Sequence, residues 1–181
     1  FIDKATKLFT LEKVNKSSAK FDLKKLNNIN AKKLNSMKVI DVYKLVIDRF
    51  KLSLNDEEQK RFISLLPELL KRVQVYTDLR DEFDWLFRKN FFCNNKNYQL
   101  QLQKNKTMLR EIGSQLKKCE WTIVNIKNCL NRYILENSLT FKDIGPILRM
   151  ALTGKTNSPD LVLIIYELGC TITVNRLNYE Y

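Results

Sequence analysis

Histidine is absent from this 181-residue chain, and glycine, proline and cysteine are scarce, with four, three and four residues respectively. Zinc sites that combine cysteine with histidine are therefore excluded. The four cysteines show neither a Cys-x-x-Cys spacing nor the dense, even framework of a disulfide-rich domain. They are Cys93, Cys119, Cys129 and Cys170. This pattern predicts reduced thiols and no metal site.

The few glycines also limit the kinds of nucleotide site that the chain can form. Gly113, Gly145, Gly154 and Gly169 make neither a Walker loop nor a dinucleotide-binding fingerprint. No apolar run reaches the roughly 18 residues of a membrane-spanning helix, and the N-terminus lacks the pattern of a signal peptide. We therefore expect a cytoplasmic protein that does not contact a membrane. The chain starts at Phe1 and not at methionine, so we also expect a piece of a longer protein.

Positive charge is present in excess. Charged residues make up 29% of the chain, the net charge is +12, and 44% of the residues are hydrophobic. This apolar content can bury one substantial core or two small ones. The charge calls for an acidic partner, most commonly nucleic acid, or for a heavily solvated surface. A basic helical domain whose lysines only keep it dispersed therefore stays open as an alternative.

The hydrophobic pattern has a helical period and no convincing run of alternating strand residues, which predicts an all-α fold. Between residues 39 and 50, apolar side chains recur every three or four positions on one helical face. They are Val39, Val42, Tyr43, Val46, Ile47 and Phe50. Asn55 and Glu58 have the spacing of a capping box and predict the start of the next helix. Pro67 in that helix predicts either a kink or two shorter helices.

A polar stretch at residues 93–97 is the best linker candidate, and we expect the chain to divide near residue 100. Further helices are predicted on both sides of it from capping residues and apolar periodicity. The first of these helices begins at Thr77 and Asp78, and the second spans residues 109–116. The third runs from Thr122 to Ile134, and the fourth starts at Thr140 with Asp143.

The last forty residues carry the most informative local pattern. Residues 148–154 end in a glycine and lead into Ser158, Pro159 and Asp160, after which an apolar helix ends at Gly169. We predict Ser158 as the N-cap and Pro159 as the first helical residue, with Asp160 complementing the positive end of the helix dipole. A helix start of this kind attracts phosphates or the acceptor edges of bases.

These residues resemble the anticodon-binding end of bacterial-type glutamyl-tRNA synthetase, a class I enzyme. The pattern of that family reads Leu-Arg-x-x-Leu-Thr-Gly, a short loop, Ser/Thr-Pro-Gly-Leu and then Leu-Gly. Residues 148–154, 158–161 and 168–169 match it. Further matching blocks precede them in the same order, at residues 9–30, 65–73 and 120–122. The resemblance therefore covers nearly the whole chain.

The resemblance implies an all-α architecture of two small helical-bundle lobes in tandem. Residues 1–38 would be the end of a stem-contact segment that links the lobes to a catalytic core. Residues 39–100 would form the first anticodon-binding lobe, and residues 101–181 the second.

The same resemblance implies that the full-length protein is a glutamate-tRNA ligase, which charges tRNA(Glu) with glutamate by using ATP and Mg²⁺. The active site of the family binds ATP phosphates through a His-x-Gly-His signature and a lysine-rich loop, and neither is present. Residues 16–22 are similar to a separate family segment downstream of that loop. We therefore expect no catalytic residue, no metal, no cofactor and no activity in this chain alone.

By resemblance, the anticodon-binding residues are Arg72, Arg149, Thr153, Ser158, Pro159 and Leu161. Arg72 falls at the arginine that recognises the third anticodon base, because the planar guanidinium can donate two hydrogen bonds to a pyrimidine. Ser158, Pro159 and Leu161 would offer a hydroxyl, backbone amides and an apolar shelf to the other bases. The alternative for Arg72 is an ordinary surface ion-pair partner.

Lysines are most in excess over residues 1–51 and 104–132. By resemblance the first segment would face the inner corner of tRNA and the second the anticodon stem, through phosphate contacts without sequence preference. The candidates for contacts with the tRNA backbone are Lys16, Lys20, Lys117 and Lys118. Each of them alone is also consistent with an ordinary solvated surface residue.

Two residues depart from the family pattern, and several aromatic residues invite a second interpretation. Asp160 replaces a common glycine and would repel RNA unless it caps the helix, and Cys170 replaces a usual lysine. Trp85, Trp121 and the pair Phe91–Phe92 could stack on bases. Their places on or beside apolar helical faces favour core packing instead.

We therefore expect a monomer with tRNA(Glu) as its partner. Two rival interpretations stay open. One is a basic helical module that docks an acidic partner protein, and the other is a stand-alone tRNA-binding paralogue. Discrimination between the tRNAs for glutamate and glutamine depends on the geometry around the third anticodon base, which Arg72 alone does not fix.

Overall fold

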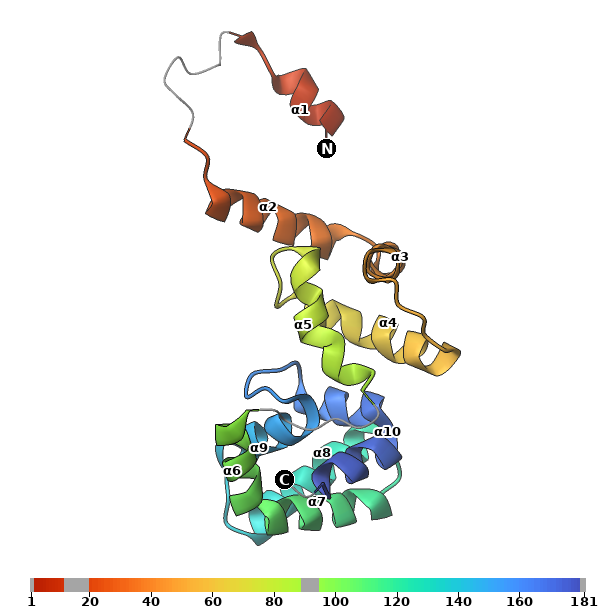
Figure 1. Ribbon diagram of the computed structural model, residues 1–181, viewed down its shortest axis with the longest axis vertical. Helices are drawn as coiled ribbons and strands as arrows, with labels where there is room; N and C mark the ends of the chain where they lie inside the picture. Colours follow the sequence, from red (N-terminus) through yellow and green to blue (C-terminus); the bar gives the residue numbers. More distant parts are fainter. Residues whose placement is uncertain (1, 12–19, 89–94, 180–181) are drawn as a thin grey trace.

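The computed structural model describes residues 2–11, 20–88 and 95–179, and these ranges contain helices and turns but no strand. The all-α fold predicted from the sequence is therefore confirmed. Figure 1 shows an elongated molecule with α1 and α2 at one end and α6–α10 at the other. The α-helices are α1 (Ile2–Leu8), α2 (Leu23–Ser36), α3 (Val39–Phe50), α4 (Asp56–Leu70), α5 (Leu79–Phe83), α6 (Lys96–Lys104), α7 (Lys106–Lys118), α8 (Ile123–Glu136), α9 (Phe141–Thr153) and α10 (Leu161–Leu177). The short 3₁₀ helices η2 (Tyr76–Asp78) and η3 (Asp84–Leu86) flank α5.

The core of the N-terminal part lies between α3, α4 and α5. The predicted apolar face of α3 is confirmed, because Val42 and Val46 are fully buried. The Phe62 ring of α4 packs edge-on against the Phe83 ring of α5, with 4.9 Å between the ring centroids. A single helix continues through Pro67, so the alternative of two shorter helices is wrong. Pro67 is exposed in the last turn of α4, and its missing N–H removes one helical hydrogen bond, the one to the carbonyl four residues earlier.

Three predicted helix starts are confirmed by their caps. The Asn55 side chain accepts a hydrogen bond from the Glu58 N–H at 2.9 Å, and the Glu58 carboxylate accepts one from the Asn55 N–H at 3.0 Å. At α9 the Asp143 carboxylate accepts from the Thr140 N–H at 2.7 Å and from the Thr140 hydroxyl at 2.6 Å, and Thr122 caps α8. Such caps each contribute about 1 kcal/mol.

The C-terminal part is built around α10, which packs against α7, α8 and α9 and also reaches α4. Its buried side chains include Leu161, Ile164, Ile165, Leu168 and Leu177. α6 lies against α9 and α7. The chain division expected near residue 100 falls inside α6, and the predicted boundary between two lobes stays a prediction.

A buried arginine holds the N-terminal and C-terminal helices together. Arg176, in the second half of α10, is only 2% exposed. Its guanidinium donates hydrogen bonds to the backbone carbonyls of Trp85 at 2.8 Å, Arg88 at 2.7 Å and Leu152 at 2.5 Å. Trp85 and Arg88 belong to the η3 region and Leu152 to α9, so this side chain joins three segments.

Both tryptophans serve packing. Trp85 is buried, and its Nε1 donates to the carbonyl of Glu82 at 2.6 Å. Trp121 packs half-buried beside the core and donates to the carbonyl of Tyr166 at 3.1 Å. These contacts agree with the core-packing interpretation. Phe91 and Phe92 lie outside the described residues.

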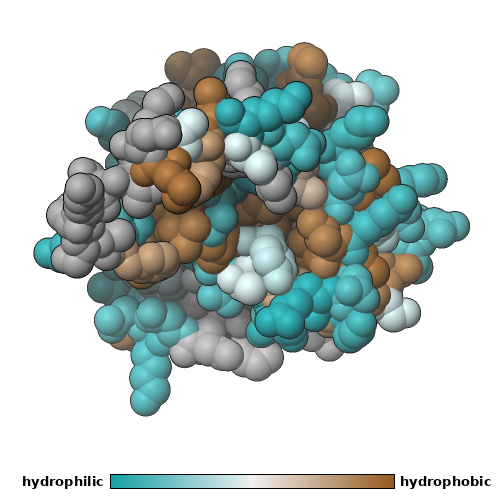
Figure 2. Space-filling model, turned by 90° about the horizontal axis from the view of Figure 1, so that it is seen from above, coloured by the Kyte–Doolittle hydropathy of each residue, from teal (hydrophilic) through white to brown (hydrophobic). Residues whose placement is uncertain are grey.

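Apolar side chains reach the surface at the end that carries α1 and α2. Figure 2 views the molecule from this end and shows apolar residues interspersed among hydrophilic ones. α2 itself buries only Leu34, and the Asn35 side chain bonds to the carbonyl of Leu70 at the end of α4. The exposed apolar residues of this region are Leu8, Phe9, Leu11, Phe21, Leu23, Leu26, Ile29, Ile40 and Leu45.

Gly169 interrupts α10 with a left-handed backbone, φ 77° and ψ 163°, at the residue where the sequence predicted the helix end. We expect Gly169→Ala to lower the free energy of unfolding by about 1–3 kcal/mol, because an L-residue is strained there. Space is not the obstacle, since the nearest atom to an added Cβ is Nη2 of Arg61 at 3.9 Å. Urea unfolding followed by circular dichroism measures the loss.

Gly113→Ala in α7 is the matched control. Its added Cβ would lie 3.5 Å from Cβ of Leu177, an ordinary contact, in a helical backbone. We expect this variant to be unchanged or more stable by up to about 1 kcal/mol. Equal losses in the two variants would contradict the strain at Gly169.

Candidate functional site

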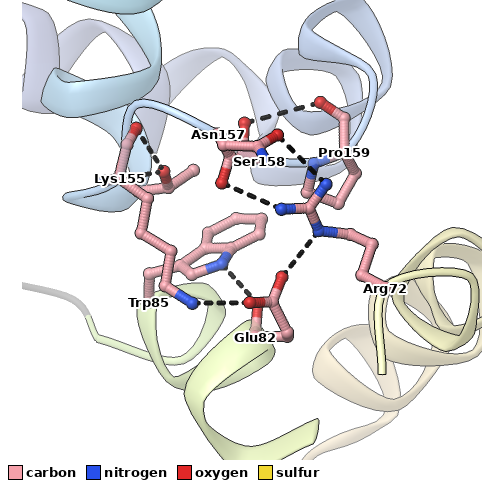
Figure 3. A network of polar contacts seen from close by, with 8 residues as sticks. Arg72, Glu82, Trp85, Lys155, Asn157, Ser158 and Pro159 are labelled. Carbon is pink, nitrogen blue, oxygen red and sulfur yellow. Dashed lines mark hydrogen bonds and ion pairs between the residues drawn. The ribbon is translucent and has the colours of Figure 1, made fainter. Parts of the chain in front are cut away.

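Arg72 lies two residues after the end of α4, and its side chain crosses to the loop between α9 and α10 (Figure 3). Its Nε donates to Oε2 of Glu82 at 2.7 Å. Its two terminal nitrogens face Asn157, with Nη1 3.3 Å from the side-chain oxygen and Nη2 3.0 Å from the backbone carbonyl oxygen. The side chain is 22% exposed, so Arg72 is a partly buried bridge between two parts of the fold.

Glu82, in α5, is the acid at the centre of this network. Its side chain is 17% exposed, and Oε1 accepts a second ionic hydrogen bond from Nζ of Lys155 at 2.7 Å. Burial on its own would raise the pKa of this carboxyl, but the hydrogen bonds and charges of Lys155 and Arg72 outweigh it and lower the pKa. Glu82 is therefore ionised at neutral pH, with one cation on each carboxylate oxygen.

The alternative expected for Arg72 was an ordinary surface ion pair. The ion pair is present, but it does not lie on an open surface. Arg72 does pair with a carboxylate, but both partners are mostly buried and come from different elements. Charge-assisted hydrogen bonds in such surroundings are shorter and stronger than exposed ones. Arg72 is therefore held in a defined direction, with its terminal nitrogens toward the 154–160 loop.

Arg149 lies on α9 beside the same loop. Its guanidinium carbon is 5.7 Å from the centre of the exposed Phe141 ring, a cation–π arrangement. Burial lowers the pKa of Arg149, the Asp160 carboxylate opposes this shift, and the positive charge of Arg72 adds to it. The positive charge of Arg72 therefore contributes to the lowered pKa of Arg149.

The loop itself is shaped by Gly154 and Thr153. Gly154 ends α9 in the left-handed conformation with φ 72°. The Thr153 hydroxyl donates to the carbonyl of Arg149 at 2.8 Å and accepts from the N–H of Lys155 at 3.3 Å. Thr153 therefore acts as an internal brace of the loop in this structure.

The predicted start of the last helix is wrong by two residues. α10 begins at Leu161, and Asp160 is its N-cap, with Oδ1 accepting from the N–H of Leu163 at 2.9 Å. Ser158 and Pro159 are instead buried in the loop, where the Ser158 hydroxyl donates to the carbonyl of Pro159 at 3.4 Å. The carboxylate of Asp160 is thus engaged at the helix start, which answers the concern that it would only repel RNA.

The predicted anticodon-binding residues therefore lie around one loop, but only some of their side chains are accessible. Arg72 contacts the 154–160 loop through Asn157, and Arg149 lies one turn before this loop on α9, where its carbonyl accepts the Thr153 hydroxyl. Ser158, Pro159 and Leu161 are buried there, and the exposed residues of the loop are Thr156, Asn157 and Asp160. The roles assigned to all six residues stay predictions.

The predicted backbone contacts lie elsewhere. Lys20 is exposed, and Lys117 and Lys118 are exposed in the last turn of α7, whereas Lys16 lies outside the described residues.

Lys118 lines a polar cavity of about 500 Å³ between α7 and α8, together with Arg132. The thiols of Cys119 and Cys129 also line it, and burial raises the pKa of both. They are therefore protonated at neutral pH.

Among the residues that the structure describes, no group of three or more histidine, cysteine, aspartate or glutamate side chains could hold a metal ion. Within those ranges no helix is long and apolar enough to cross a membrane.

Sequence reasoning did not identify Glu82, Lys155 or Asn157. Lys155 and Asn157 lie between two matched motifs, so their place in the loop was a usable signal. No sequence signal pointed to Glu82, because its partners Arg72 and Lys155 lie 10 and 73 positions away in the chain. Only the fold brings its carboxylate to Arg72.

Comparison with known proteins assigns the family. The model of the family "Anticodon binding domain" matches residues 31–180. The glutamate-tRNA ligase 1 of Bartonella tribocorum is 29% identical over 181 residues, which cover 94% of this chain and 38% of that protein. The glutamate-tRNA ligase of Mycoplasma capricolum is 28% identical over 177 residues, covering 95% and 37%.

A solved structure supports the fold. The crystal structure of a glutamate tRNA ligase from Elizabethkingia meningosepticum, in complex with its amino acid, superposes with a TM-score of 0.82 at 19% identity. The match covers 98% of this chain and 36% of that one. The chain thus spans little more than a third of these relatives, and the resemblance inferred from its motifs is confirmed. The chain belongs to the anticodon-binding domain family.

Proposed function

We propose that this chain is the tRNA-selecting part of a glutamate-tRNA ligase and that it binds the anticodon stem and loop of tRNA(Glu). The observation that carries the proposal is the Arg72 guanidinium, which Glu82 holds by one edge while its terminal nitrogens face the 154–160 loop. A preset donor pair beside an exposed loop suits recognition of an unpaired base.

Arg72 is the proposed reader of the third anticodon base. Its two terminal nitrogens can donate to two neighbouring acceptors, such as those on the Watson–Crick edge of cytosine. Guanine presents donors there and would be rejected. Arg149 supports the same site with a second positive charge and with the ring of Phe141, on which a base can stack.

The loop residues complete the proposed site. Ser158, Pro159 and Leu161 are buried, so their contribution would be the shape of the loop and its backbone groups, with any direct contact by their side chains requiring the loop to open. Thr153 braces the loop through its hydroxyl. Lys20, Lys117 and Lys118, with Lys16, are the proposed contacts to tRNA phosphates.

The full-length protein would use ATP and Mg²⁺ to charge tRNA(Glu) with glutamate, in the cytoplasm and as a monomer. This chain corresponds to about 38% of the relative from Bartonella tribocorum. We propose that it selects tRNA, needs no cofactor of its own and has no ligase activity alone.

Binding to tRNA(Glu), and to a tRNA(Glu) whose anticodon loop is replaced, tests the proposal at 50 and 200 mM salt. We expect affinity to fall by roughly tenfold or more across this range, as for three or more neutralised phosphates. The native loop should stay preferred at both salt concentrations. Equal, purely salt-dependent binding to both RNAs would instead favour the protein-docking module, because an acidic partner needs only generic electrostatics.

A further inference from the structure

Glu82 makes two ionic contacts that distinguish it from the other carboxylates at this site. Its two oxygens take cations from different elements, Arg72 after α4 and Lys155 in the 154–160 loop, each at 2.7 Å. Its own backbone carbonyl accepts the indole N–H of buried Trp85 at 2.6 Å, which ties Glu82 to a side chain of the core. The acid is therefore rigidly placed, and Lys155 offsets the charge that it would otherwise present to RNA.

The contact with Glu82 decides which donors of Arg72 remain for other partners. A guanidinium has five N–H groups, one on Nε and two on each terminal nitrogen. Glu82 takes the Nε hydrogen, so the donors of the two terminal nitrogens remain for other acceptors and face Asn157. Rotation about the last side-chain bonds of Arg72 would otherwise spread those donors over many directions.

The contacts of Asn157 indicate which kind of partner the two terminal nitrogens of Arg72 can bind. It presents two acceptors from one residue, a side-chain oxygen 3.3 Å from Nη1 and a carbonyl oxygen 3.0 Å from Nη2. Two adjacent acceptors are also what cytosine offers through its O2 and N3 atoms. The Asn157 side chain is exposed, so a base can displace its oxygen from Nη1 by a side-chain rotation, whereas displacing its backbone carbonyl from Nη2 requires a shift of the loop next to buried Ser158.

We propose that Glu82 is a positioning residue for base recognition: it fixes Arg72 through Nε so that Nη1 and Nη2 meet the two adjacent acceptors of cytosine. This inference rests on the proposed function of Arg72. Glu82 touches no base, and its effect is on selectivity and not on the general attraction to RNA.

Glu82→Gln tests this assignment, because it keeps the size of the side chain and removes its charge. The measured quantity is the ratio of affinities for tRNA(Glu) with C and with G at the third anticodon position. We expect the ratio to fall by roughly three- to tenfold in Glu82→Gln. Affinity for the G-containing tRNA should hold or rise, since a negative charge has been removed.

Lys155→Gln is the matched control, since it also loses an ionic contact to Glu82 but leaves the Arg72 contact in place. It should weaken binding to both tRNAs and keep their ratio. In an Arg72→Ala background, Glu82→Gln should leave the ratio unchanged. Thermal unfolding of each variant confirms that it is folded.

The outcomes separate the two proposals. If Arg72→Ala abolishes the base preference while Glu82→Gln preserves it, or shifts both affinities equally, Glu82 is merely structural and the positioning role is overturned. If wild type shows no preference, or Arg72→Ala keeps it, the proposed role of Arg72 fails and the role of Glu82 fails with it.

Discussion

Arg176→Met is expected to lower the free energy of unfolding by about 3–5 kcal/mol, because each buried carbonyl that loses its charged donor costs about 1–3 kcal/mol. The guanidinium of Arg176 is 2% exposed and satisfies the carbonyls of Trp85, Arg88 and Leu152. Methionine fills a similar length but donates nothing, so three carbonyls at the junction would lose their donors. Urea unfolding followed by circular dichroism measures the change.

Arg88→Met provides the control for this prediction. The Arg88 side chain pairs with Asp84, and the two are 50% and 46% exposed. Such an ion pair contributes about 0–1 kcal/mol, so the control should lose little. A loss below about 1 kcal/mol in Arg176→Met would show that the junction does not depend on its guanidinium.

The second large effect is expected from Arg72→Ala, which should remove the preference for C over G at the third anticodon base. A bidentate contact between a side chain and a base discriminates by about 1–3 kcal/mol, and this amount should disappear from the variant. Arg72→Lys should recover charge but little preference, because an ammonium lacks the planar fork. Fluorescence or filter binding with both tRNAs measures the ratio.

Arg80→Ala removes the same charge at an exposed position of α5, where Arg80 lies 5.5 Å from the Phe50 ring centre. It should weaken binding to both tRNAs by a similar factor and preserve the base preference. If Arg72→Ala behaves in the same way as Arg80→Ala, Arg72 contributes charge and does not recognise the base.

The helix starts differ in how far the sequence predicts them. Asn55 with Glu58, Thr122, and Thr140 with Asp143 cap their helices as expected, because capping is decided within a few residues. The last helix offers two suitable caps, and burial of Ser158 leaves Asp160 to do the capping. The position of this helix start therefore depends on tertiary packing and not on the neighbouring residues alone.

Three helices, α1, α2 and α6, were not expected at all. α2 and α6 are rich in lysine, asparagine and glutamine, and each buries a single residue, Leu34 and Leu102. Helical periodicity is visible only where a stripe of apolar side chains faces a core. In these two segments only one apolar side chain faces the core, so their helices become evident only in the folded chain.

The candidate site divides in a similar way. Arg72 and Arg149 were found through motifs that the family shares, and the structure brings them within reach of each other's charge. Glu82 lies outside those motifs, and its partners are distant in sequence. The direction of Arg72 is a property of this tertiary contact, so no pattern of neighbouring residues could predict it.

The most direct measurement is the affinity of the wild-type chain for tRNA(Glu) and for the same tRNA with its third anticodon base changed from C to G, at 200 mM salt. At this concentration the generic attraction to phosphates is weakened, while a base contact is retained. The account predicts that C is preferred by roughly 5- to 150-fold, the equivalent of about 1–3 kcal/mol. Equal affinities would contradict it, since the donors that Glu82 directs through Arg72 would then recognise no base.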